Sequence, residues 1–125
     1  MSKFMSDEYI SQVQSALAQD PKWIESTKSF KTSVAFNVTD TGQNYVMGVE
    51  NGVTSFQKVA PGTAAEFSFD GNFDAWSKIA KGEVDIQSAV LRGQLKFKGS
   101  LTKILMYKDR FVRVAEIMRD VPKEF

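Results

Sequence analysis

Few side chains in this chain could carry out chemistry, because its 125 residues include no histidine and no cysteine. Disulfides, thiolate nucleophiles, Cys/His zinc sites and His-based triads are therefore excluded. Two carboxylate pairs remain as acid–base candidates, Asp70 with Asp74 and Glu83 with Asp85. Each pair stands where a helix is expected to begin, and unpaired N–H groups stabilise a carboxylate there. Helix capping is the favoured role, and we expect no enzyme, no bound metal and no cofactor.

Phosphate and nucleic-acid recognition find no support in the sequence. The glycines stand singly in expected turns and strands, so neither a dinucleotide-binding fingerprint nor a P-loop occurs. RNA-stacking sheets expose their aromatic residues, whereas Phe30, Phe36, Phe67 and Phe69 share expected strands with polar residues that point the other way. We therefore expect these rings to be buried under helices and predict no nucleic-acid partner.

Charge is unevenly distributed along the chain, although the formal net charge is only +1. From Arg92 onward nine residues are basic and four are acidic, while the preceding part is net acidic. A basic end favours contact with anionic lipid headgroups or an acidic partner, and a solvated helix surface is the simpler alternative. The acidic start differs from a signal peptide, and no run approaches the roughly 20 apolar residues of a membrane span. We expect a cytoplasmic protein.

Helical spacing marks the beginning of the chain, and alternation marks the part that follows. Ser6 is placed to cap a first helix, and Asp20-Pro21 to begin a second. From Phe30 the apolar residues recur at every second position, with turn residues at 40–42, 51–52 and 61–62. This pattern predicts four consecutive strands as an antiparallel meander, with one face that needs a helical cover.

The expected cover follows directly in the sequence. Asn72, Asp85 and Ser100 are placed to cap three helices, and a further apolar stripe between 109 and 120 predicts a last one. Between them lies a short fifth strand in "LRGQLKFKGS", with Leu95 and Phe97 inward. The length and the 42% apolar content suit one domain over residues 1–125. Ten phenylalanines, two tryptophans and five methionines fit either a filled core or an apolar cavity.

Residues 82–106, "GEVDIQSAVLRGQLKFKGSLTKILM", closely resemble the sterol carrier protein type 2 family. The family run has the form G-x-x-x-x-Q-S-A-x-x-x-G-K-L-K-x-x-G, and the matching residues are Gly82, Gln87, Ser88, Ala89, Gly93, Leu95, Lys96 and Gly99. Upstream, Phe73 and Ile79 fall in place on the family's D-x-x-F-x-x-[LI]-x-x-G helix, and the resemblance spans about residues 25 to 110. The chain departs from the family in Gln94, where lysine is common, and in its long C-terminal helix. Its last residues, Lys-Glu-Phe, are not a peroxisomal address.

The resemblance implies an α+β fold with a five-stranded, mainly antiparallel sheet, several short helices over one face, and a hydrophobic tunnel. It implies non-catalytic binding and transfer of a sterol, fatty acyl chain, acyl-CoA or phospholipid. Stripe direction and the family match together give the expected cavity residues, with Gln87 and Gln94 as polar contacts: Phe36, Val38, Met47, Phe67, Trp76, Ile79, Gln87, Val90, Leu91, Gln94, Leu95, Phe97, Ile104, Leu105, Phe111, Val114 and Met118.

Two other functions stay open at this point. The protein could be an accessory or scaffold that presents a lipid or quinone-like intermediate to biosynthetic enzymes. It could also be an enzyme that uses Tyr45, Tyr107, Lys103 or a carboxylate, although the sequence offers no activating neighbour. Helix 109–120 is expected to serve either as a lid over the ligand or as a homodimer surface.

Overall fold

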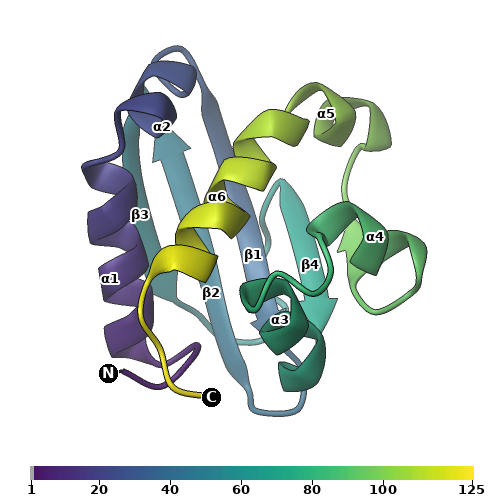
Figure 1. Cartoon of the computed structure of the whole chain (residues 1–125). Coiled ribbons are helices and arrows are strands. Elements are labelled where there is room, and N and C mark those ends of the chain that lie inside the picture. Colours follow the sequence, from purple (N-terminus) through teal and green to yellow (C-terminus); the bar gives the residue numbers. More distant parts are fainter. Residues whose placement is uncertain (1) are drawn as a thin grey trace.

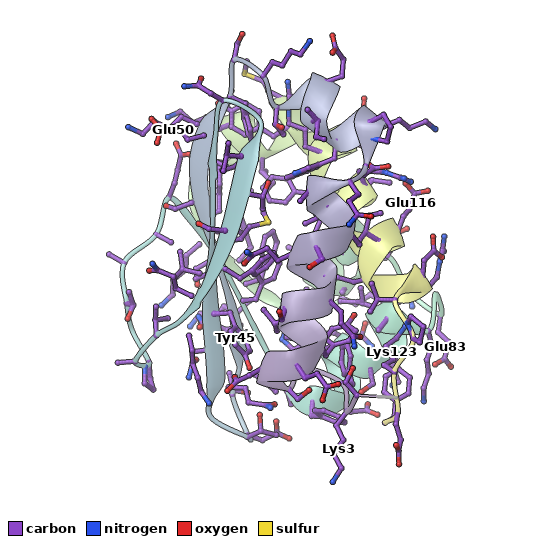
Figure 2. All side chains as sticks on the ribbon, turned by 90° about the vertical axis from the view of Figure 1, so that its left-hand side faces the viewer. Lys3, Tyr45, Glu50, Glu83, Glu116 and Lys123 are labelled. Carbon is purple, nitrogen blue, oxygen red and sulfur yellow. The ribbon has the colours of Figure 1, made fainter. Side chains whose placement is uncertain are left out.

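The computed structural model describes residues 2–125, which form a five-stranded sheet with six helices packed over one of its faces (Figure 1). Figure 2 shows the sheet and the helical layer edge-on. The helices are α1 (Asp7–Ala18), α2 (Pro21–Ser26), α3 (Phe73–Ala80), α4 (Ile86–Leu91), α5 (Leu101–Met106) and α6 (Lys108–Asp120). The strands are β1 (Lys31–Val38), β2 (Gln43–Glu50), β3 (Val53–Lys58), β4 (Phe67–Gly71) and β5 (Lys96–Lys98).

Helices α1 to α5 begin where polar caps were predicted, while α6 follows Tyr107 without a side-chain cap. Each cap side chain accepts a hydrogen bond from the backbone N–H three residues later, which satisfies a donor that the first turn leaves unpaired. These caps are Ser6, Asp20, Asn72, Asp85 and Ser100. Gly82 and Gly93 follow α3 and α4 with positive φ, and Asn51-Gly52 makes the predicted two-residue hairpin turn.

The predicted meander is wrong at its last step. The strand order is β3-β2-β1-β4-β5, and β4 lies parallel to β1, with Val34 opposite Phe67. The connection between β3 and β4, residues 59–66, is not a tight turn. It leads back to the far side of β1, and its last residue, Glu66, donates its N–H to Ser33 Oγ at 2.9 Å. The other three strand pairs are antiparallel, so the expected mainly antiparallel sheet is confirmed.

The burial of β1 explains this order. Val34 and Ala35 point to opposite faces of the sheet, yet their exposed fractions are 0% and 1%. A strand buried on both faces belongs in the middle of a sheet rather than at an edge. Placing β4 beside β1 also stacks Phe36 on Phe69, with ring centroids 6.3 Å apart. The expected burial of Phe30, Phe36, Phe67 and Phe69 is confirmed.

Helix α6 is the main cover of the sheet. It crosses the middle of the sheet in Figure 1 and packs against α1, α2, α3 and α4. Its buried stripe consists of Phe111, Val114, Ile117 and Met118. The Tyr9 hydroxyl of α1 donates to the Met118 carbonyl at 2.7 Å, which fixes the C-terminal end of the helix.

The short strand β5 depends on the glycine that follows it. Gly99 has φ +140°, and a Cβ atom there would lie 2.8 Å from Phe67 Cδ1 and 3.1 Å from the Glu66 carbonyl oxygen. We expect Gly99→Ala to lower the free energy of unfolding by about 1–3 kcal/mol, since it adds a clash to an unfavourable φ. Urea denaturation followed by circular dichroism measures this loss.

Gly42→Ala is the matched control for this substitution. Gly42 also has a positive φ, but a Cβ atom added there would have no neighbouring atom within 4 Å. Gly42→Ala should lower the free energy of unfolding by about 1 kcal/mol, the cost of placing alanine at a positive φ. Equal losses at both positions would contradict the close packing of Gly99 against Phe67.

Candidate functional site

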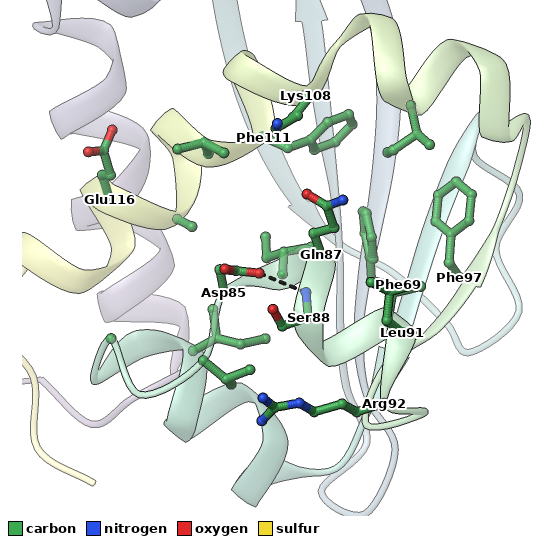
Figure 3. A pocket seen from close by; sticks show the side chains of 18 of the residues that line it. Phe69, Asp85, Gln87, Ser88, Leu91, Arg92, Phe97, Lys108, Phe111 and Glu116 are labelled. Atoms are coloured by element: carbon green, nitrogen blue, oxygen red, sulfur yellow. Dashed lines mark hydrogen bonds between the residues drawn. The ribbon is translucent and has the colours of Figure 1, made fainter.

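A groove of about 800 Å³ lies at the β4–β5 end of the sheet, between the sheet and helices α4, α5 and α6 (Figure 3). Phe69 of β4 and Phe97 of β5 contribute aromatic rings from the sheet. The apolar side chains from the helices are Ile79, Ile86, Val90, Leu91, Leu101, Ile104, Leu105, Phe111, Val112 and Ala115, with Val84 from the loop before α4. The volume falls within the range of roughly 300–1,000 Å³ that is usual for small-molecule sites.

The groove is open to solvent on the side formed by α4 and α5. Helix α5 has no buried residue. Leu91, Leu101 and Leu105 line the groove and are 79%, 67% and 65% exposed. The resemblance implied an enclosed tunnel, whereas the structure has a groove here whose apolar wall reaches water.

Polar side chains occupy the other end of the groove. Asp85 and Glu116 lie on the far side of Gln87 from Leu91 and Phe97 in Figure 3. Asp85 accepts a hydrogen bond from the Ser88 backbone N–H at 2.7 Å, and this bond holds the pKa of its carboxyl below the usual range. An ionised cap is an acceptor rather than a proton donor, so the capping role predicted for Asp85 is confirmed.

The predicted cavity residues divide into two groups. The groove lining includes Ile79, Gln87, Val90, Leu91, Phe97, Ile104, Leu105 and Phe111. The core, or the turn that precedes β5, holds the others: Phe36, Val38, Met47, Phe67, Trp76, Gln94, Leu95, Val114 and Met118. The apolar stripes of the sequence do not separate these groups: the core residues are buried, whereas Leu91 and Leu105 of the groove lining are largely exposed.

Gln94, which was expected as a polar contact, is not among the residues that line the groove. Its Oε1 atom is buried and has no hydrogen-bond partner among the residues that the structure describes. Its backbone carbonyl oxygen would lie 3.3 Å from a Cβ placed on Gly71, so the turn before β5 packs closely on the end of β4.

Sequence reasoning missed the face of α6 that lines the groove. Lys108, Val112, Ala115 and Arg119 recur at helical spacing and all line it. This face mixes charged and apolar residues, so it lacks the uniform apolar stripe that marks a buried helix face. The other missed lining residues come from five places: Phe69 on β4, residues 82–86 and Ser88 before and within α4, Arg92 directly after α4, Leu101 on α5 and Glu116 on α6.

Of the side chains considered for catalysis, Glu83 and Asp85 line the groove, whereas the two tyrosines and Lys103 do not. The Tyr45 hydroxyl donates to the Met5 carbonyl and to Asp7, and burial raises the pKa of Tyr45. Lys103 is ion-paired with Glu66 at 3.1 Å, and the Tyr107 ring packs against Phe30. Within residues 2–125, no cluster of three or more acidic side chains could hold a metal ion.

None of the helices described between residues 2 and 125 is long and apolar enough to cross a bilayer.

Solved structures share this fold at low sequence identity. A crystal structure of sterol carrier protein 2 matches with a TM-score of 0.85 and 17% identity, covering 96% of this chain and 100% of that one. Sterol carrier protein 2 of Aedes aegypti, solved in complex with the C16 fatty acid palmitate, matches with a TM-score of 0.57 and 20% identity, over 89% of this chain and 96% of that one. A UbiJ-SCP2 ubiquinone synthesis protein matches with a TM-score of 0.61 and 12% identity, over 86% and 90%.

No curated protein sequence matches the chain. The sequence profile of the SCP-2 sterol transfer family matches residues 12–111, which include the sheet and most of the groove lining. The chain therefore belongs to the SCP-2 sterol transfer family.

Proposed function

We propose that this protein binds the hydrocarbon chain of a lipid in the groove between β4–β5 and α4–α6 and carries it without chemical change. One observation carries the proposal: the groove is lined mainly by aliphatic and aromatic side chains and opens to solvent through an apolar wall. The palmitate complex of the Aedes aegypti relative supports an acyl chain as the ligand class.

Removal of the chain from water would drive binding. Each buried CH₂ group contributes roughly 0.8 kcal/mol, so a chain of about 16 carbons needs no specific polar contact to bind. In the groove, such a chain would contact Phe97, Phe111 and Val90. Because apolar contact does not discriminate between headgroups, we expect fatty acids, acyl-CoA and phospholipids to compete for the groove, with sterols as a further candidate class.

The first test is native mass spectrometry of freshly purified protein, with extraction and identification of any retained lipid. Ala115→Trp is the test variant, because Ala115 is half-buried on the α6 wall and an indole there would fill the groove. We expect this variant to lose retained lipid and to bind a fluorescent fatty acid at least about tenfold more weakly, since several CH₂ groups would stay in water.

Val53→Trp is the control for the groove-filling variant. Val53 is exposed on β3, at the opposite edge of the sheet from β5. It should bind the fatty acid as the wild type does, and both variants should keep the wild-type circular dichroism spectrum. An empty wild-type protein that takes up no fatty acid, acyl-CoA or phospholipid would refute the carrier function.

The accessory or scaffold role remains the alternative. The UbiJ-SCP2 ubiquinone synthesis protein supports this alternative, because it shares the fold of this chain. In that role the protein would keep its ligand during incubation with acceptor membranes and would capture biosynthetic enzymes in a pull-down. Rapid ligand transfer to membranes without such partners favours the carrier.

Several features stay predictions alongside this function. They are a single domain over residues 1–125, a cytoplasmic location and a homodimer. Cell fractionation of a tagged copy and analytical ultracentrifugation test the last two.

A further inference from the structure

Exposed apolar side chains gather beside the open side of the groove. We call Leu91, Leu101, Leu105, Met106 and Val112 the groove mouth; all five are exposed, and all but Met106 line the groove. They come from α4, α5 and the start of α6, at the right-hand end of the molecule in Figure 1. Concentrated apolar exposure of this kind marks an interaction surface.

The segment that supplies four of the five groove-mouth residues carries charge of only one sign, whereas Val112 on α6 has Asp109 and Glu116 as helical neighbours. Residues 86–108 include five basic residues and no acidic one. These basic residues are Arg92, Lys96, Lys98, Lys103 and Lys108. Arg92 and Lys108 line the groove, and Lys96 and Lys98 are exposed on β5, on either side of Phe97. The apolar mouth is thus bordered by cations.

Three other basic residues near the C-terminus are engaged within the fold. Arg113 forms a bidentate pair with Asp20, and Arg110 donates to the Ser26 carbonyl at 2.9 Å. Lys123 Nζ donates to three backbone carbonyls at the end of α6. Within the segment from Arg92 to Lys108, Lys103 is paired with Glu66 at 3.1 Å. The basic residues that remain to border the groove mouth are therefore Arg92, Lys96, Lys98 and Lys108, while Arg119 lines the groove farther along α6.

We propose that the groove mouth docks on an anionic lipid bilayer. The exposed leucines and Met106 enter the boundary between headgroups and acyl chains, while the side chains of Arg92, Lys96, Lys98 and Lys108 contact lipid phosphates and carboxylates. Docking in this orientation opens the groove directly onto the bilayer, so an acyl chain passes between membrane and groove without crossing bulk water. This inference rests on the proposed function, because it states how the ligand reaches the groove.

The positive charge beside the groove mouth favours an anionic bilayer over a second copy of the protein. A second copy packed symmetrically on the groove mouth would bring two sets of cations together, which is unfavourable. Helix α1 is a poor alternative for docking, because its only charged residues, Asp7 and Glu8, are acidic and its apolar face is buried. An anionic surface complements the groove mouth in both charge and polarity.

Sedimentation with vesicles tests the docking surface, using the full chain at low and high salt. Wild type should bind vesicles of phosphatidylcholine with phosphatidylserine, bind pure phosphatidylcholine weakly, and lose binding at high salt. The double variant Lys96→Gln/Lys98→Gln should lower vesicle partitioning by at least about tenfold, since each cation near the surface contributes roughly fivefold. Leu101→Ser/Leu105→Ser should lower it as well, because it removes the inserted apolar groups.

The matched control removes two cations at the other end of the molecule. Lys22 on α2 and Lys58 on β3 lie away from the groove mouth, with β3 at the sheet edge opposite β5. Lys22→Gln/Lys58→Gln should bind vesicles within about twofold of wild type. Equal losses in both charge variants, or no binding of wild type to anionic vesicles, would overturn the docking surface. The docking surface would also be overturned if wild type is a dimer in solution and the Leu101→Ser/Leu105→Ser variant is a monomer.

Two readouts separate this inference from the proposed function. The Lys96→Gln/Lys98→Gln variant should bind a fluorescent fatty acid in solution as wild type does, because neither lysine lines the groove, and should transfer it to anionic vesicles more slowly. Ala115→Trp should bind vesicles normally and fail to bind the fatty acid. If wild type binds the fatty acid but not the vesicles, docking is refuted and the carrier function stands; the reverse result refutes the carrier function alone.

Discussion

Trp76→Ala is expected to lower the free energy of unfolding by about 3–5 kcal/mol, because it deletes a fully buried ring from the core. Trp76 lies on α3 with no exposed surface, and its ring meets that of Phe36 edge-on at 5.7 Å. Its Nε1–H donates to the Asn37 carbonyl at 3.0 Å. The substitution thus removes apolar contacts and a hydrogen bond between α3 and the backbone of β1. Urea denaturation monitored by far-ultraviolet circular dichroism measures the loss.

Trp76→Phe separates the ring from its hydrogen bond. It keeps most of the apolar contact but cannot donate to Asn37, so we expect a smaller loss, about 1–3 kcal/mol. Because Trp76 does not line the groove, Trp76→Phe should leave fatty-acid affinity unchanged. A large drop in affinity at unchanged stability would contradict the assignment of Trp76 to the core.

Asp20→Ala is the second substitution with a large expected effect, because one carboxylate performs two structural tasks. Asp20 caps α2 through the Trp23 N–H at 3.0 Å, and its two oxygens accept from Arg113 Nε and Nη2 at 2.8 and 2.7 Å. Only 10% of its side chain is exposed. Loss of the cap and of the largely buried pair should together cost about 3–5 kcal/mol, measured by urea denaturation at neutral pH.

The Asp20 pair also predicts how stability depends on pH. The hydrogen bonds from Arg113 lower the pKa of the Asp20 carboxyl in the folded state. A lowered folded pKa means that the pair stabilises the protein above the unfolded pKa, about 3.9, and that this contribution is lost as pH falls further. The stability difference between wild type and Asp20→Asn should therefore shrink below about pH 4.

Asp74→Asn is the control for the charge effect. Asp74 forms an exposed i,i+4 pair with Lys78 at 3.2 Å, and such pairs contribute little in water. We expect a loss below about 0.5 kcal/mol. If Asp20→Asn behaves like Asp74→Asn at neutral pH, the bridge between α2 and α6 is not stabilising.

Local signals in the sequence predicted the elements well. Capping residues such as Asn72 and Asp85, and the alternation that begins at Phe30, depend on neighbours within a few residues. Strand order is not local in this sense. The parallel pairing of β4 with β1 depends on where residues 59–66 lead the chain. The apolar residues of β4 would alternate in the same way beside β3 or beside β1, so the alternation does not reveal which strand is the neighbour.

The groove was harder to predict than the fold for a related reason. Leu95 and Phe97 both point away from solvent, yet Leu95 is core and Phe97 lines the groove. The difference arises because α4, α5 and α6 leave a space over one end of the sheet, and this spacing is a tertiary property. The resemblance indicated the right segment, since residues 82–106 supply most of the groove lining.

The parallel pairing of β1 and β4 also bears on how the chain folds. Strands β1, β2 and β3 follow one another through short turns, so this hairpin unit can form early and locally. The β4 side of β1 stays unpaired until residues 59–66 have led the chain back to it. An unpaired central strand is a template for other chains, so we expect refolding at high concentration to favour aggregation from this intermediate. The central strand β1 thus obtains its second partner, β4, only after the first three strands have paired.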